Sequence, residues 1–512
     1  MPAVRLPVIM SIRWGLGACL LVVMTASGAG AGGCSEADCA TLGECAAPPS
    51  SVDAGSNADG ESSRTYPEVP PPPGCDPTAD PKDALSCLDD AYALFVDAIG
   101  GSNSGRGSKA APLRSIDAAT NVDALAGRSR IYVCGTGSFD ESVRLPPNVS
   151  LVGGFACNSW TYSGEVPRIA PSRPEIALRL SGSAKGVVVS DLQIVAARAE
   201  GDGASSVAVL VASSKATLRR VAAMAGEGAA GLRPTTSTNH DASVSLTGNP
   251  GDSAPGGTRT CACAKRGSST GGKGGGLGGN GAEGSLDPFR AGYGGTAGTG
   301  GASCTAGGRG GNGAAGGAGG RRAAVLGALT AEGWTPGRGG DGTTGDPGGG
   351  GGGGGGTSTK CGGGGACGGC GGSGGAGAPG GGGSIALALF ESDVTLVGGT
   401  FRSSQAGDGG QGGNGEDGAS GGFGGSGGCQ GGDGGHGAGG GAGAGGAGGV
   451  SAPVLTFGGR LEQGDAQLLP GGGGARGAPG SPGKSPAGAA AAGGAGEEGL
   501  ELLVVPQGIV RL

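Results

Sequence analysis

The sequence is poor in the residues from which conventional cores and catalytic centres are built. Aromatic side chains make up 3% of its 512 residues, and it has two histidines, His240 and His436. So few large apolar groups argue against a single large globular core. Both histidines stand in polar or glycine-rich surroundings, far apart in sequence, which favours solvated loop positions for each.

The sequence also lacks the features of several classes of partner and of several classes of enzyme. The net charge of −7 is spread thinly, without a basic cluster, which argues against nucleic acid as a partner. No segment after the N-terminal region is long and apolar enough to predict a transmembrane helix. The sequence has no convincing nucleophile elbow, phosphate loop or Ser-His-Asp pattern. We therefore expect no catalytic residues, no metal and no cofactor.

Glycine, by contrast, is abundant at 131 residues, and much of it recurs at every third position. Six tracts carry this period: 272–284, 292–319, 339–354, 362–383, 409–427 and 431–449. A flexible linker needs only composition, whereas polyproline II rods need glycine in a fixed phase where two backbones touch. We expect packed polyproline II rods. The alternative is disordered spacers, because ordering glycine is entropically costly.

Residues 1–33 have the features of an export signal, with positive charges, a short apolar run and small residues. Ala31-Gly32-Gly33-Cys34 resembles a bacterial lipobox, although Ala31 stands where that family has Leu. The resemblance implies lipidation at Cys34 and, with Ser35 beside it, sorting to the outer membrane or cell surface. The membrane, through this anchor, is thus an expected partner. An ordinary signal-peptidase site also fits, so a secreted form is the alternative.

Composition divides the rest of the chain. Residues 34–74 are rich in Ser, Asp and Pro and predict a disordered tether. Short apolar strands between Ser/Gly turns predict a cap and β-coils over 75–224, with the best helical pattern at Asp83–Tyr92. Further coils are predicted at 384–401, 451–469 and 499–512. The glycine-rich insertions between them are 225–383, 402–450 and 470–498, the last less regular and predicted to be loose.

An internal repeat supports stacked coils. Val207–Leu218 aligns without a gap with Ile385–Leu396, and Val149–Phe155 returns as Val394–Phe401. In addition, Phe95-Val96-Asp97 and the polar glycine loop after it resemble the entry motif of right-handed parallel β-helix proteins. The resemblance implies a mainly β fold, a parallel β-helix. We expect the glycine-rich insertions to leave it on one side and pack into one polyproline II bundle.

Two further resemblances concern the whole chain. Tracts such as Gly421–Gly428 resemble PGRS-type glycine-rich secreted bacterial proteins, although this chain has no PE-type helical domain. The tracts with cysteines are also similar to the polyproline II bundle of snow-flea antifreeze proteins. Both imply an exported, low-complexity protein rather than a known reaction.

Fifteen cysteines in an exported chain predict disulfides. Setting aside Cys19 and Cys34, the candidates are Cys39, Cys45, Cys75, Cys87, Cys134, Cys157, Cys261, Cys263, Cys304, Cys361, Cys367, Cys370 and Cys429. The seven in or beside the glycine blocks are odd in number, so one thiol is free or pairs between chains. The C-x-x-C at Cys367 and Cys370 keeps a zinc or redox site as an alternative to disulfides.

Two sets of acidic and amide residues suggest binding or catalysis as an alternative to ordinary turn positions. Calcium-binding nonapeptide repeats would draw on Asp408, Asn414, Asp417 and Asp433, but the large apolar residue that such repeats need is missing. Glycoside chemistry needs two carboxyl groups at a set separation. The acids near predicted strands are Asp140, Glu141, Asp191 and Asp393, and nothing in the sequence singles them out.

These observations predict a non-enzymatic cell-envelope protein, structural or adhesive, anchored by lipid and in contact with polysaccharide or other surface material. One alternative is a binding module for a repetitive ligand, either polysaccharide or ice. The other is a β-helix carbohydrate-active enzyme that uses Asp191 and Asp393.

Overall fold

The computed structural model describes residues 66–235, 237–241, 243–287, 294–486, 493–494 and 509–512. The fold is mainly β, with 26% of residues in strands and 3% in helices, and its sheets include a curled one built from parallel strands. The predicted signal, Cys34, Cys39, Cys45 and the first part of the predicted tether lie outside the described residues.

The larger sheet has eleven described strands, paired in parallel throughout. Its strands are β1 (Ala93–Asp97), β2 (Arg130–Cys134), β4 (Val143–Leu145), β5 (Ser150–Phe155), β7 (Leu178–Ser181), β8 (Val187–Ser190), β10 (Ser206–Ala212), β11 (Lys215–Arg219), β18 (Ser384–Val397), β20 (Ser451–Glu462) and β22 (Ile509–Arg511). The long strand β18 bends at Glu391, whose φ is 47°. Its first half pairs with β10 and its second half with β11, so this one sheet forms two faces.

A second parallel sheet of six described strands forms a further face, in the order β21-β19-β12-β9-β6-β3. These strands are β3 (Ser138–Phe139), β6 (Arg168–Ile169), β9 (Gln193–Val195), β12 (Ala222–Met224), β19 (Thr400–Arg402) and β21 (Gln467–Leu469). Val, Ile and Leu alternate inward from both sheets and meet in one core, which includes Leu151, Ile194, Val209, Leu218 and Leu396. Such alternation is the signature of strands with one buried face.

The strand register confirms the repeat found in the sequence. Val207 pairs with Ile385 and Leu218 with Leu396, as the gap-free alignment of the two segments requires. Leu151 belongs to the column of Leu218 and Leu396, because Val189 of β8 pairs with Leu218 on one side and with Leu151 on the other. One buried polar ladder runs beside these columns: the N–H of Ser183 donates to Ser214 Oγ (3.0 Å), and the N–H of Ser214 donates to Ser392 Oγ (3.1 Å).

The segment before β1 differs from the prediction. The helix expected over Asp83–Tyr92 is reduced to three residues of 3-10 helix, Leu85–Cys87, because side chains of Asp80 and Asp89 accept nearby backbone N–H groups and turn the chain. Residues 66–74, predicted as part of the tether, pack instead: Val69 N–H donates to the carbonyl of Gly127. Two short helices follow, α1 (Ile116–Thr120) and α2 (Val122–Leu125).

All three glycine-rich insertions leave from the same corner of the fold, as predicted. Each lies between a strand of the six-stranded sheet and the next strand of the larger sheet: β12 to β18, β19 to β20, and β21 to β22. The first insertion also carries a three-stranded antiparallel sheet and a hairpin. These are β13 (Arg259–Ala262), β14 (Ser268–Gly271) and β15 (Ser285–Asp287), and β16 (Gly327–Thr330) with β17 (Gly333–Pro336).

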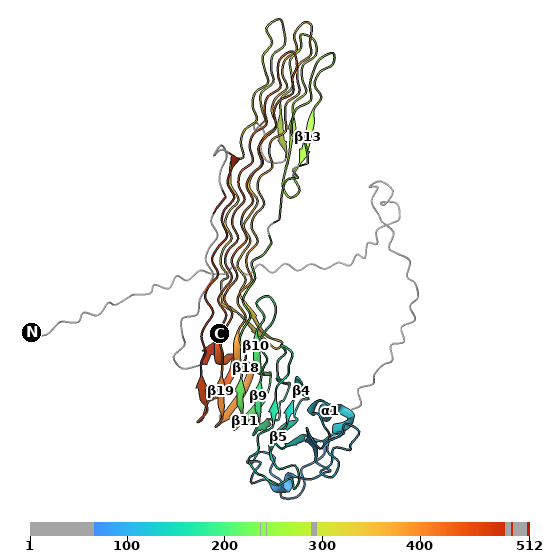
Figure 1. Ribbon diagram of the computed structural model, residues 1–512, viewed down its shortest axis with the longest axis vertical. Coiled ribbons are helices and arrows are strands. Elements are labelled where there is room, and N and C mark those ends of the chain that lie inside the picture. The colour runs from blue at the N-terminus through green and yellow to red at the C-terminus, as the bar shows by residue number, and fades with distance from the viewer. Residues whose placement is uncertain (1–65, 236, 242, 288–293, 487–492, 495–508) are drawn as a thin grey trace, which may run out of the picture. The chain divides into compact units, whose positions relative to one another are not determined.

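The glycine tracts are ordered and lie side by side (Figure 1). Three of the neighbours of the central tract, 362–383, bond to it with a period of three. The N–H groups of Gly369, Gly372 and Gly375 donate to the carbonyls of Gly435, Ala438 and Gly441 in a parallel tract. Their own carbonyls accept from Gly348, Gly345 and Gly342 in an antiparallel tract. The carbonyls of Cys370, Ser373 and Ala376 accept from Ala419, Glu416 and Gly413 in a third tract.

The predicted phase slip at Cys429-Gln430 is a turn. On either side of it, tracts 407–425 and 431–449 run antiparallel, and Gly434, Gly437 and Gly440 donate to Gly422, Ala419 and Glu416. The prediction that the last insertion is loose is wrong for residues 474–483. There, Gly474, Gly477, Gly480 and Gly483 donate to Gly449, Gly446, Gly443 and Gly440 at the same spacing.

The tracts approach so closely that one row in the central tract, the one with Gly371, admits no side chain, and Gly372 in a second row admits none either. A Cβ at Gly371 would lie 2.0 Å from the carbonyl oxygen of Gly345, and a Cβ at Gly374 would lie 2.0 Å from that of Gly342. The obstacle in each case is backbone, which cannot rotate away as a side chain would. The period of three in the sequence is therefore a steric requirement of this packing.

We predict that Gly374→Ala destabilises the protein by about 1–3 kcal/mol or more, because an added methyl group forces two tracts apart. Gly276→Ala is the matched control, since a Cβ there meets no atom within 4 Å. Urea unfolding of both variants beside the parent chain measures the difference. Equal stability of the two variants would contradict the packing.

Candidate functional site

The region with the most specific side-chain chemistry is the glycine bundle, meaning the hydrogen-bonded tracts of the three insertions, with its disulfides. Ten of the predicted disulfide cysteines pair: Cys75–Cys87, Cys134–Cys157, Cys261–Cys367, Cys263–Cys370 and Cys304–Cys429. The last three close loops of 106, 107 and 125 residues. In the chain-entropy model each such closure is worth about 4–5 kcal/mol.

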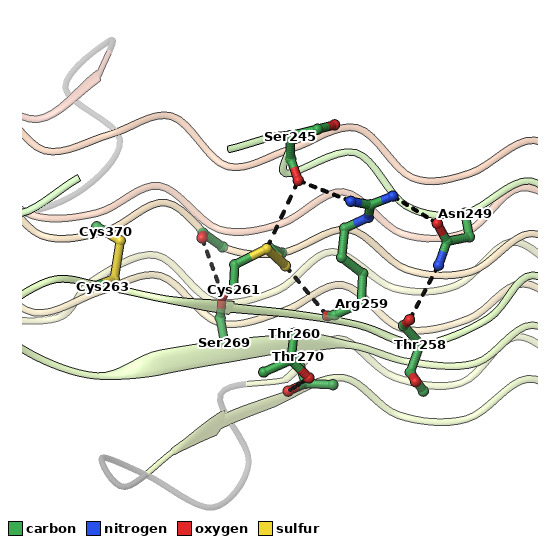
Figure 2. Close-up of a disulfide and its surroundings, with 12 residues drawn as sticks. Ser245, Asn249, Thr258, Arg259, Thr260, Cys261, Cys263, Ser269, Thr270 and Cys370 are labelled. Carbon is green, nitrogen blue, oxygen red and sulfur yellow. Dashed lines mark hydrogen bonds between the residues drawn. A yellow bond between two sulfur atoms is a disulfide. The ribbon is translucent and has the colours of Figure 1, made fainter. Parts of the chain in front are cut away.

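Two of these bridges tie β13 to the central tract, and Figure 2 shows the Cys263–Cys370 bond next to Cys261. Cys261 lies on β13 and Cys263 directly follows its last residue, and both bond to the central tract, so the two side chains point the same way. On a tract with a three-residue period, Cys367 and Cys370 share a row. The C-x-C and the C-x-x-C are thus complementary spacings. The two cysteines of the C-x-x-C bond to different partners, not to each other, which removes them as a free zinc or redox pair.

Polar side chains surround these bridges (Figure 2). The guanidinium of Arg259 donates to the carbonyl of Ser245 (3.3 Å) and to Oδ1 of Asn249 (2.8 Å). The Asn249 amide in turn donates to the carbonyls of Gly257 and Thr258. Ser269 Oγ donates to the carbonyl of Gly368 in the central tract. These bonds fix the insertion's own small sheet to the bundle around the sulfur atoms.

Cys361 corrects one prediction, because it is a free thiol and not a disulfide partner. It is buried, with 3% of its surface exposed, at the start of the central tract. The odd number of cysteines in the glycine region predicts one thiol that is free or pairs between chains, and Cys361 is the free one. Burial in the bundle explains why it remains unpaired, since another thiol would need to enter tightly packed backbone to reach it.

The residues considered for calcium have a different role. Oδ1 of Asp408, Asn414 and Asp417 accepts the N–H of Ala475, Ser481 and Lys484 in the neighbouring tract, at 2.7–2.9 Å. Oδ1 of Asp433 accepts from Gly424 N–H (2.9 Å). Each oxygen serves a different backbone group, so the four side chains do not converge on one point. They supply acceptors for N–H groups that the carbonyl ladder leaves over, so these side chains join neighbouring tracts of the bundle.

The two histidines were expected in solvated loops, and this is wrong for His436. Its Nδ1 accepts the N–H of Gly421 (3.1 Å), so it belongs to the same set of side-chain acceptors. Burial and the nearby Arg309 lower the pKa of His436. His240 lies at the bundle's side, with Nδ1 3.0 Å from the carboxylate of Glu416.

Three of the four acids near the strands, Asp140, Glu141 and Asp191, are engaged in structural hydrogen bonds. Oδ1 of Asp140 accepts from the N–H of Ser172. Glu141 accepts the first two N–H groups of α1, and burial raises its pKa. Asp393 stands in register between Lys215 and Arg460 on adjacent strands. Asp191 belongs to an ionic cluster of its own, so the structure assigns none of these four acids to a shared catalytic pair.

That cluster clamps the N-terminal segment onto a corner of the sheets. Arg220 Nε contacts Asp191 Oδ1 at 2.6 Å, and its two terminal nitrogens contact the carboxylate of Asp80 at 2.7 and 2.8 Å. Tyr162 donates to Asp191 at 2.9 Å. The hydrogen bonds from Arg220 hold the pKa of Asp80 below its usual range, and both carboxylates raise the pKa of Arg220. Sequence reasoning missed this cluster because its members are far apart in the chain.

Within the described residues, one group of potential metal ligands comes together, Asp97 with Cys134 and Cys157. The two sulfur atoms are bonded to each other, so this group is not a ligand set. Among all the residues that the structure describes, no helix is long and apolar enough to cross a bilayer. Comparison with family models, curated proteins and solved structures finds no match.

We predict that Asp80→Asn lowers the free energy of unfolding by about 1–3 kcal/mol at neutral pH, because the substitution replaces a charge-assisted pair of hydrogen bonds to Arg220. Since the pKa of folded Asp80 is lowered, its contribution is complete above the ordinary carboxyl pKa of about 3.9 and is lost as the pH falls through the folded value.

Urea unfolding of parent and Asp80→Asn at neutral and acid pH tests this, with Asp83→Asn as the exposed control. The parent's advantage should shrink toward zero in acid. A difference that is independent of pH would contradict the ionic origin.

Proposed function

We propose that this is a non-enzymatic protein of the cell envelope, a structural or adhesive surface protein anchored by lipid at Cys34. In this proposal the stacked parallel strands form a parallel β-helix, and the tracts form a polyproline II bundle carried by it. The regular register of three strand columns supports the β-helix. The three-residue hydrogen-bond period supports polyproline II, which has three residues per turn.

One observation carries the proposal: tracts from all three insertions bond to one another at every third residue. An element that is bonded along its length and closed by three disulfides is stiff and protected from proteases, both useful outside a cell. Asp140, Glu141 and Asp191 already accept hydrogen bonds from other parts of the chain, which argues against a catalytic role for these three acids. Reproducible hydrolase or lyase activity of the purified protein on polysaccharide would overturn the non-enzymatic proposal.

A second candidate is a binding module for a repetitive ligand, polysaccharide or ice. The observation in its favour is that polar side chains recur at every third residue along one tract: Gln405, Asp408, Gln411, Asp417 and Ser420 are exposed, and Asn414 is half-buried. At about 3.1 Å per residue, such a row repeats roughly every 9 Å. Like the PGRS-type and antifreeze proteins that the tracts resemble, a chain of this kind would present a periodic surface.

We predict that trypsin cuts the bundle slowly until its disulfides are reduced. The probes are Lys273, Arg309, Arg321, Arg338 and Lys360, which all lie in the first insertion. Protection in the oxidised protein and rapid cutting after reduction are expected, because reduction removes the three long-loop bridges. Rapid cutting at all five residues under both conditions would contradict a rigid bundle.

The anchor is tested separately. We predict that Cys34→Ser shifts the protein from the membrane fraction to the soluble fraction, since lipid attached at Cys34 is the proposed anchor. Cys19→Ser, which changes the only other cysteine of the first 34 residues, is the control and should leave the distribution unchanged. Fractionation followed by immunoblotting measures both. An unchanged distribution of Cys34→Ser would favour the secreted form.

A further inference from the structure

Two arginines lie side by side on the outer face of the larger sheet. Arg144 of β4 and Arg179 of β7 are direct register partners, and their strand neighbours point into the core. Adjacent strands are about 4.8 Å apart, so two like charges in register repel each other. The next residue in the column, Leu210 of β10, is apolar and buried. The column therefore changes from charged to apolar at this point.

The column changes from charged to apolar where the β16–β17 hairpin begins to cover the sheet. The β16–β17 hairpin from the first insertion packs Leu329 and Trp334 over Leu210 and its neighbours. The turn of the hairpin, at Ala331 and Glu332, ends beside the arginines. Together they line a hollow of about 280 Å³. Because the hairpin belongs to the glycine-rich insertion and the arginines belong to the sheet, the hollow exists only in the assembled fold.

Glu332 is the one acid among the described residues that lines the hollow, and it forms no ion pair with either arginine. Among the described residues, neither guanidinium has a carboxylate oxygen within 4 Å. Arg179 donates one bond, to the backbone carbonyl of Glu332 at 2.9 Å, which orients it toward the hairpin turn. Partial burial and the charge of Arg144 lower the pKa of Arg179, and the charge of Glu332 offsets this only in part. An anion between the two guanidiniums would relieve that repulsion.

We propose that the Arg144–Arg179 hollow binds the anionic substituent of an acidic polysaccharide, a uronate carboxylate or a sulfate ester. Each guanidinium presents several N–H donors in the fork geometry that such oxyanions accept, and the register places the two arginines on neighbouring strands. The hollow is open at the surface, which suits a substituent on a polymer better than a buried metabolite. The chain as a whole carries −7, so attraction of an anionic polymer requires a local site. This inference deepens the adhesive part of the proposed function and rests on it.

The test measures binding of the full mature protein to immobilised polygalacturonate and dextran sulfate, with neutral dextran as the blank. We expect binding to at least one anionic polymer that weakens with added salt, because screening is strong above about 0.1 M. Arg144→Gln and Arg179→Gln should each weaken it about tenfold or more, which corresponds to 1.4 kcal/mol or more. Glu332→Gln should strengthen it, since the nearby carboxylate competes with the ligand.

Arg168→Gln, an exposed arginine on β6 in the other sheet, is the matched control and should bind like the parent. Preference for one polymer identifies carboxylate or sulfate as the ligand. No binding to either polymer, or an equal loss in Arg168→Gln, would overturn the site. Either result would leave the rigid, non-enzymatic bundle standing, because trypsin protection is measured without any ligand.

Discussion

The structure depends on backbones that touch without Cβ atoms between them. In the central tract, the row that contains Gly371 and Gly374 lies so close to its neighbour that an added methyl carbon would overlap a carbonyl oxygen. This closeness lets hydrogen bonds form at every third residue in three directions. Glycine loses the most entropy on ordering, and each such bond returns only about 1 kcal/mol net. The bundle therefore needs many neighbours at once, and three insertions leaving from one corner provide them.

The other positions of the triplets carry the side chains that join the tracts to one another. Some are cysteines, which hold tracts together through closures longer than 100 residues. Others, such as Asp417 and His436, accept backbone N–H groups that no carbonyl reaches. Acidic and amide residues in a glycine field are thus explained by the donors of the neighbouring tract. The sheets contribute a fixed base, because their register sets where each insertion leaves and returns.

Sequence reasoning was most successful where a short period determines contacts. The alignment of Val207–Leu218 with Ile385–Leu396 predicted the register, and the glycine phase predicted ordered tracts and their turns. It failed where contacts join distant segments. The odd cysteine count predicted one thiol that is free or pairs between chains, but it could not identify Cys361. Local helical spacing at Asp83–Tyr92 was overridden by Asp side chains that turn the chain. The Arg220 cluster and the arginine hollow carry no motif, since tertiary packing alone creates them.

The most direct test of the central claim is amide hydrogen exchange in the oxidised protein, read at Gly369, Gly372 and Gly375. These amides donate to a neighbouring tract at 2.9 Å and are buried. The account predicts exchange as slow as that of the core strand β10, because opening any one of them requires separating tracts that are bonded along their length. Exchange at the rate of an unstructured glycine chain would contradict the packed bundle.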